Sequence, residues 1–79
     1  MRYTVMLEAI SDPQMAGWYY ARIPTLDLTT HGEGIDGALA AAADLAKGWI
    51  AERRERGESV PVEEQTLVGH IVVADAVQL

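Results

Sequence analysis

Apolar and polar residues alternate with a period of about two over the first part of the chain, which is the spacing of a half-buried β-strand. Residues 2–10 (RYTVMLEAI) form the first such run, and a turn with Asp and Pro (SDPQ) follows it. The second run is 18–23 (WYYARI), and it ends at Pro24, which has no N–H for a strand ladder. Residues 26–30 (LDLTT) alternate again. Because short connections join these runs, we predict a three-stranded antiparallel meander.

The spacing of apolar residues becomes helical from Ile35 to about Arg56. Several of them fall within about 60° of Leu39 on a helical projection, which predicts one alanine-rich buried stripe that a neighbouring element can approach closely. The stripe consists of Ile35, Leu39, Ala42, Ala43, Ala46 and Ile50. Gly57 is suited to the left-handed position after a helix, and Pro61 prevents the helix from resuming. The strand pattern is interrupted between the third strand and this helix, at residues 31–34 (HGEG).

Residues 67–77 predict a fourth strand, because they contain the consecutive β-branched residues Ile71, Val72 and Val73. The element order is then β-β-β-α-β, within a single domain over residues 1–79. A helix of roughly 20 residues carries the chain back along the sheet, so the fourth strand should run parallel to the first. A right-handed crossover gives the strand order 3-2-1-4, with the helix on one face of the sheet. The predicted fold class is α+β.

Composition narrows the classes of function. The chain is 49% hydrophobic and 23% charged, which is typical of a globular domain. It has no cysteine, so disulfides and thiol chemistry are excluded. Twelve acidic and six basic residues give a net charge of −6, which disfavours direct nucleic-acid binding and favours a basic partner. Neither a signal peptide nor an apolar run long enough for a membrane span is recognisable, so we expect a cytoplasmic location and no membrane association.

Candidate catalytic and cofactor-binding motifs are sparse. His31 and His70 are the only histidines and lie far apart, and neither has an adjacent metal-ligand motif. The predicted topology matches the front half of a ribonuclease H-like fold, whose nucleases hold two metal ions with carboxylates on the first strand, the helix and the fourth strand. Glu8, Asp44 and Asp75 fall on those elements, but Asp44 lies about 140° from the buried stripe and should point to water. We therefore expect no enzyme, metal or cofactor, and a vestigial metal-dependent nuclease is the less favoured alternative.

Two features favour self-association. Trp49 lies on one flank of the helix, and Trp is a frequent interface anchor. The predicted last strand is apolar and would form a sheet edge, which natural proteins rarely leave uncovered. A homo-dimer or tetramer would also enlarge the small core. The predicted self-association residues are Trp49, His70, Ile71, Val72 and Val73.

Short motifs follow one another along the chain in a familiar order. A Tyr-x-Val strand start precedes a Gly-aromatic strand that ends in Ile-Pro, and an Ala-Leu helix start precedes an Arg/Glu-rich helix end with Gly and Pro after it. The matching positions are Tyr3, Val5, Gly17, Ile23, Pro24, Gly32, Ala38, Leu39, Gly57 and Pro61. In order and spacing, over nearly the whole chain, they resemble the N-terminal domain of the HicB-like antitoxin family.

The resemblance implies a partial ribonuclease H-like fold without nuclease activity. HicB-like antitoxins neutralise a small basic toxin, the mRNA-cleaving HicA type, by covering its active site. The acidic composition fits such a partner, and the candidate contact residues at the strand corners are Asp12, Asp27, His31 and Glu33. We expect a stand-alone domain without the DNA-binding C-terminal segment that many family members carry. The alternative is an orphan HicB-like oligomeric domain, structural or regulatory, with a partner that is not a toxin.

Overall fold

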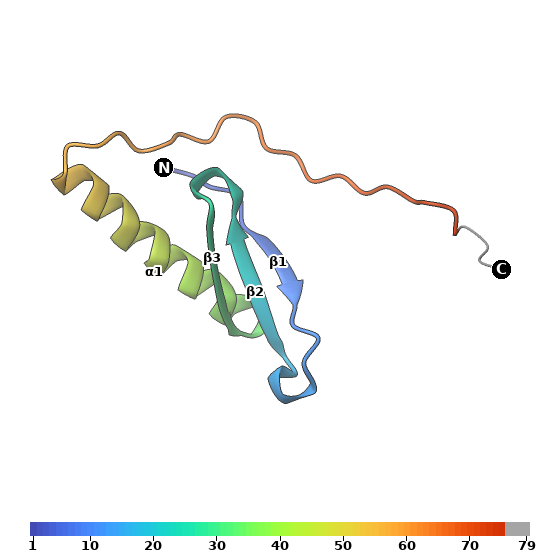
Figure 1. Ribbon diagram of the computed structural model, residues 1–79. Helices are drawn as coiled ribbons and strands as arrows, with labels where there is room; N and C mark the ends of the chain where they lie inside the picture. The colour runs from blue at the N-terminus through green and yellow to red at the C-terminus, as the bar shows by residue number, and fades with distance from the viewer. Residues whose placement is uncertain (76–79) are drawn as a thin grey trace.

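The computed structural model describes residues 1–75, and it shows a three-stranded antiparallel sheet packed against one long helix (Figure 1). The strands are β1 (Met6–Ala9), β2 (Trp18–Ile23) and β3 (Leu28–Glu33), and the helix is α1 (Gly34–Glu55). β2 is central and pairs with both neighbours. The predicted α+β class, the antiparallel meander and the single helix on one face are confirmed.

The corner between β2 and β3 differs from the prediction. Residues Pro24–Leu26 form a 3₁₀ turn, η2, closed by the N–H of Asp27, which donates to the carbonyl of Pro24 at 3.1 Å. Leu26 therefore turns into the core, where it is 5% exposed, instead of opening a strand. At its other end β3 continues to Glu33, so the predicted break at residues 31–34 was placed too early. The prediction of β2 was correct at both ends.

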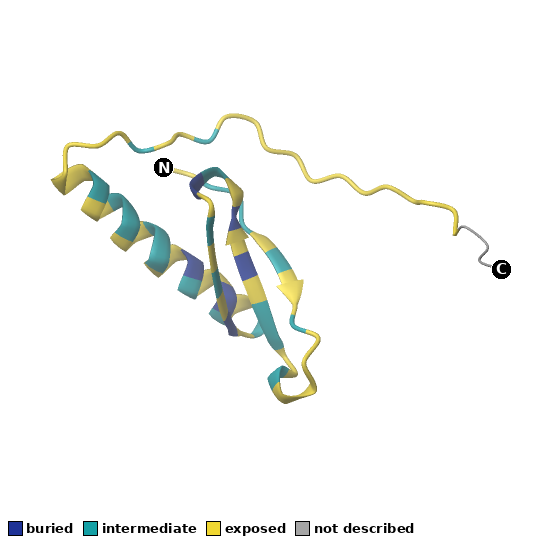
Figure 2. Cartoon of the chain, viewed as in Figure 1, coloured by how far each residue is buried: buried dark blue, intermediate teal, exposed yellow. Residues whose placement is uncertain are grey.

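The buried face of α1 is rotated from the predicted stripe. Ala38 and Ala42 are buried, as are Ala21 and Ile23 of β2 opposite them (Figure 2). Leu39, which was the centre of the predicted stripe, is 40% exposed. The prediction of a one-sided, alanine-rich helix was correct, but the centre of the stripe was wrong, because the helix packs on β2 and β3 through its smallest residues.

The close approach of β3 to α1 at Gly32 explains why the residues at this contact are small. A Cβ atom placed on Gly32 would lie 2.5 Å from the carbonyl carbon and oxygen of Gly37 and 2.6 Å from the nitrogen of Ala38. Strand and helix backbones are thus nearly in contact, and only glycine on β3 and glycine or alanine on α1 permit this spacing.

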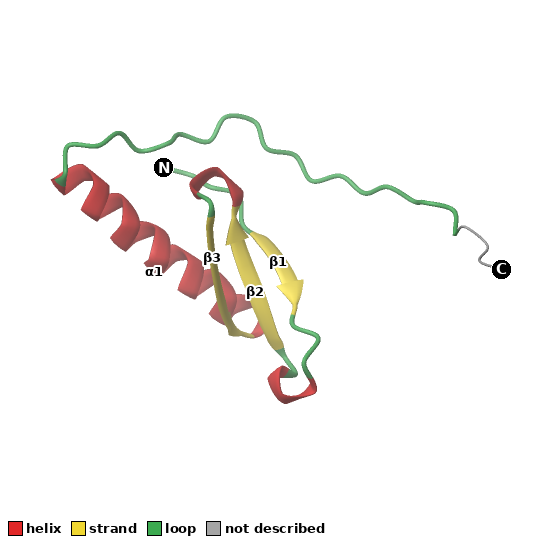
Figure 3. Ribbon diagram, in the orientation of Figure 1, coloured by secondary structure: helices red, strands yellow, loops and turns green. Residues whose placement is uncertain are grey.

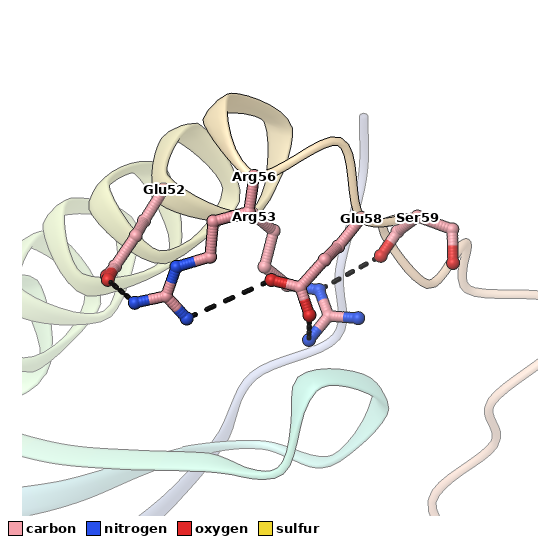
Figure 4. A network of polar contacts seen from close by, with 5 residues as sticks. All are labelled: Glu52, Arg53, Arg56, Glu58 and Ser59. Atoms are coloured by element: carbon pink, nitrogen blue, oxygen red, sulfur yellow. Dashed lines mark hydrogen bonds and ion pairs between the residues drawn. The ribbon is translucent and has the colours of Figure 1, made fainter.

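The C-terminal end of α1 is held by backbone and arginine contacts. Gly57 adopts the left-handed conformation (φ 71°), and the N–H of Glu58 donates to the carbonyl of Arg53 at 2.9 Å. This confirms the predicted role of Gly57. Arg53 also donates through Nε to the carbonyl of Ser59 at 2.9 Å, while Arg56 pairs with Glu52 at 2.6 Å (Figure 4). These contacts direct the chain back toward the N-terminus.

The predicted fourth strand is not formed. Residues 58–75 contain no helix or strand, and positions 76 and 77 of the predicted strand lie outside the described residues. The observed strand order is β1-β2-β3, without the fourth position that order 3-2-1-4 requires. The reason is that residues 67–75 have no neighbouring element to pack against: all of them are exposed, with Ile71 at 86% and Val72 at 99%. The radius of gyration is 16.1 Å, whereas a compact chain of this length has about 12 Å.

Candidate functional site

The face of the sheet that points away from α1 is open. Figure 3 shows α1 on one side of the three strands. Because side chains alternate along a strand, β2 buries Ala21 and Ile23 under the helix and presents Trp18, Tyr20 and Arg22 on the other side. The register places Tyr20 between Glu8 of β1 and His31 of β3. We call the side chains on this side of the sheet the open face; its residues are Met6, Glu8, Trp18, Tyr20, Arg22, Thr29, His31 and Glu33.

The side chains of the open face contact one another across the strands. The ring centroids of Trp18 and His31 are 5.8 Å apart, and the guanidinium of Arg22 lies 5.6 Å from the centroid of Tyr20. Arg22 also forms an ion pair with Glu8 at 3.1 Å. The two side chains are 49% and 64% exposed, so the pair adds little stability. The result is a pre-arranged aromatic and charged surface, which is the composition of many protein interfaces.

The four predicted partner-contact residues do not form one cluster. Asp12 lies in the turn between β1 and β2, where its carboxylate accepts the N–H of Gln14 at 2.9 Å. Glu33 is the last residue of β3 and pairs with Trp18, the first residue of β2, and His31 lies two residues before Glu33. Asp12, His31 and Glu33 therefore lie at the same end of the sheet. Asp27 lies at the opposite end, one strand length away, about 17–20 Å. One partner contact can thus combine Asp12 with the open face, to which His31 and Glu33 belong. The side chains of Asp12, His31 and Glu33 are exposed.

A second candidate surface is an apolar groove of about 300 Å³ between α1 and the segment that precedes β1. Met1, Tyr3 and Val5 line one side, and Leu39, Ala43 and Ile50 lie on the helix side. The groove is open because α1 lies over β2 and β3, away from β1. We call it the N-terminal groove.

A polar anchor lies beside this groove. Thr4 donates to the carboxylate of Glu63 from its backbone N–H at 2.7 Å and from its hydroxyl at 2.6 Å, and the hydroxyl of Thr25 donates to it at 3.0 Å. The phenol of Tyr3 donates to the carbonyl of Pro61 at 2.6 Å. The hydrogen bonds from Thr4 are the main cause that holds the pKa of Glu63 below its ordinary value, and Thr25 and Arg2 add to the effect. The chain after α1 is thereby fixed to the N-terminal segment.

Replacing Glu63 with alanine should release this anchor. We expect the Thr4 amide to exchange with solvent at least several-fold faster than in the unmodified chain, measured by NMR at neutral pH. Because the pKa of Glu63 is lowered in the folded chain, the carboxylate contact is complete at neutral pH. It is lost as the pH falls through that lowered pKa, because protonation removes the negative charge that accepts these hydrogen bonds. The exposed neighbour Glu64 supplies the control, since Glu64→Ala removes no bond to Thr4. Equal protection of Thr4 in both variants would contradict the anchor.

The carboxylates of the nuclease alternative do not come together. Glu8 is paired with Arg22 on the open face, Asp44 is exposed on α1, and Asp75 lies in the extended segment. Within residues 1–75, no three histidine or carboxylate side chains are close enough to hold a metal ion. His31 lies against Trp18, and His70 is exposed in the extended segment.

The predicted self-association residues occupy two different environments. Trp49 packs against the core cluster, and the guanidinium of Arg53 lies 4.8 Å from the centroid of its ring. His70, Ile71, Val72 and Val73 are exposed. Sequence reasoning missed the open face, although the alternation of WYYARI could have indicated it. It also missed the N-terminal groove and the Glu63 anchor, for which the sequence offers no comparable signal.

Comparisons with protein-family models, with curated proteins and with solved structures returned no match. Over residues 1–75, no helix combines the length and the hydrophobicity needed to cross a membrane.

Proposed function

We propose that this chain is a non-catalytic binding domain that sequesters a small basic protein in the cytoplasm, as a HicB-like antitoxin sequesters a HicA-type toxin. The observation that carries the proposal is the open face: Trp18 and Tyr20 are solvent-accessible and pre-arranged, and Asp12 and Glu33 flank them. The chain as a whole has a net charge of −6. Aromatic anchors with a charged rim suit a protein partner, and the sign of the charge selects a basic one.

The expected ribonuclease H-like architecture requires a fourth strand beside β1. One contact supports this part of the proposal: the chain after α1 returns to Thr4, just before β1, and is fixed there by Glu63. A strand parallel to β1 would have to begin at this end of the sheet. Residues 67–77, from the same chain or from a second copy, remain the segment that we propose for it.

The two kinds of contact have separate physical roles. Carboxylates at the rim accelerate encounter with a basic partner, and salt at about 0.1 M screens the attraction between charges more than about 10 Å apart. Burial of Trp18 and Tyr20 supplies affinity that depends much less on salt. We therefore expect association to slow as salt rises, while the aromatic contacts govern how long the complex lasts.

The test is a tagged pull-down from the native cytoplasm at low salt, followed by titration calorimetry with the purified partner. We expect a stoichiometric small basic protein that is released as salt rises. The double variant Asp12→Lys/Glu33→Lys should weaken binding at least tenfold. The control Asp44→Lys/Glu55→Lys changes the net charge equally but alters only exposed positions of α1, and it should weaken binding much less.

Equal losses in the two double variants would show that the partner responds to net charge and not to this face. If the pull-down finds only copies of this chain, at any salt concentration, the basic-partner proposal is wrong. The second candidate function, an oligomeric structural or regulatory domain with a different partner, would then take its place. The exposed apolar residues after Thr66 favour that candidate.

A further inference from the structure

The last described part of the chain exposes an unusual amount of apolar surface. We call Leu67–Ala74 the apolar tail. Leu67 is 80% exposed, Ile71 is 86% exposed and Val72 is 99% exposed. Isolated exposed apolar residues are common, but a contiguous run of them marks a surface that another element covers. The run also contains Ile71, Val72 and Val73, which favour strands.

A surface of matching character is present on the folded part of the molecule. The N-terminal groove is lined by apolar side chains, and β1 beside it is an edge strand with unpaired N–H and C=O groups. In an extended tail, Leu67, Ile71 and Val73 share one side because side chains alternate. This side can enter the groove while the tail backbone pairs with β1.

The path of the tail points away from its own groove. Glu63 fixes the chain at Thr4, and no glycine or proline between Glu63 and Leu67 favours a reversal. From the anchor the chain runs outward past the sheet (Figure 1). Residues 64–75 can span about 40 Å when extended, while the molecule measures 30 Å and 20 Å along its two shorter axes. The tail is long enough to reach a second molecule.

We propose that the apolar tail of one copy docks as a fourth strand along β1 of a second copy, with its side chains in the N-terminal groove, and that the exchange is reciprocal. A second copy is favoured as the occupant because the tail runs away from its own molecule after the Glu63 anchor, and because the tail and the groove are both apolar where they would meet. Reciprocal exchange gives a dimer with two-fold symmetry, to which no further copies add. In this dimer the free edge of β1 is covered in each copy. The open face, on the other side of the sheet, stays free, so the dimer does not require the basic partner proposed above.

Introduced cysteines test the exchange directly, because the chain contains none of its own. One chain carries Ile71→Cys in the tail, and a second chain with a different tag carries Leu39→Cys in the groove. The two are refolded together and oxidised. We expect a disulfide-linked dimer that contains both tags. A disulfide only between two Ile71→Cys chains would show tail-to-tail pairing and overturn the proposal, as would the absence of any linked dimer.

A chain with both cysteines distinguishes exchange from folding back. Exchange gives a linked dimer on a non-reducing gel, whereas a tail in its own groove gives an oxidised monomer and overturns the proposal.

Solution mass supplies an independent test that does not rely on cysteine. By light scattering we expect a dimer for the unmodified chain, unchanged by salt. Ile71→Asp/Val72→Asp should weaken dimerisation at least tenfold. Val62→Asp is the control, since Val62 is also exposed, at 74%, but precedes the anchor. A monomeric unmodified chain would overturn the proposal, and so would an equal effect of the control.

Circular dichroism of each variant verifies that α1 is intact. If the dimer forms independently of salt and no basic partner is found, the tail exchange is supported and only the proposed function is contradicted.

Discussion

Replacing Gly32 with alanine should destabilise the domain by about 3 kcal/mol, the upper end of typical overpacking costs. The added Cβ would lie 2.5 Å from backbone atoms of Gly37. Those atoms belong to the first turns of α1, so relief of the clash requires the helix to move away from β3. That movement would also open the contacts of Ala38 and Ala42, which are 0% and 1% exposed. Urea unfolding followed by circular dichroism measures the loss.

The matched control for this prediction is Gly48→Ala. Gly48 lies within α1, and a Cβ placed there would meet nothing within 4 Å. Alanine in a helix interior is favoured over glycine by about 0.5–1 kcal/mol, so this variant should be more stable than the unmodified chain. A Gly32→Ala variant that unfolds at the same urea concentration as the unmodified chain would contradict the close approach of β3 and α1.

Replacing Ile23 with alanine should cost about 3–4 kcal/mol, within the usual range for deleting a buried aliphatic side chain. Ile23 is 2% exposed and is the largest fully buried side chain among residues 1–75. The other buried hydrophobic residues in this part of the chain are Leu26 and three alanines, so few neighbouring groups can fill the cavity. A domain of this size has a total stability of about 4–12 kcal/mol, and we expect a large decrease in the melting temperature, measured by scanning calorimetry.

Ile35→Ala removes the same atoms from a position that is 51% exposed. We expect a change within about 0.5 kcal/mol, since substitutions at exposed positions are usually small. Both variants should be measured at one protein concentration, because self-association would add to the stability of either. Equal losses for Ile23→Ala and Ile35→Ala would mean that the core does not lie between β2 and α1.

Local signals were sufficient for most of the fold. Both ends of β2 were predicted correctly, because Gly17 precedes the strand and Pro24 terminates it. The ends of α1 were predicted within one residue. The left-handed Gly57 was predicted from its position after the last helical turn. Each of these features depends on residues close in sequence, so a single chain contains the information that determines them.

The candidate site was predictable only in part. Strand alternation contained the information for the open face, although it was overlooked. Trp18 pairs with Glu33, so Glu33 and His31 lie at the same end of the sheet as Asp12, and Asp27 lies at the other end. This arrangement follows from the strand register, which the sequence alone does not give. The Glu63 anchor joins residues 59 positions apart in sequence, and hydrogen-bonding capacity alone does not indicate which partner such a carboxylate will find.

The sequence by itself determined the bounds of β2, the helix, the helix end and the negative net charge, because these follow from periodicity, backbone preferences and composition. Tertiary structure alone decided the rotation of α1, since the clearance at Gly32 outweighs the apolar stripe centred on Leu39. It also decided that residues 67–75 form no strand in a single copy. A strand needs a partner for its backbone and a surface for its side chains, and β propensity provides neither.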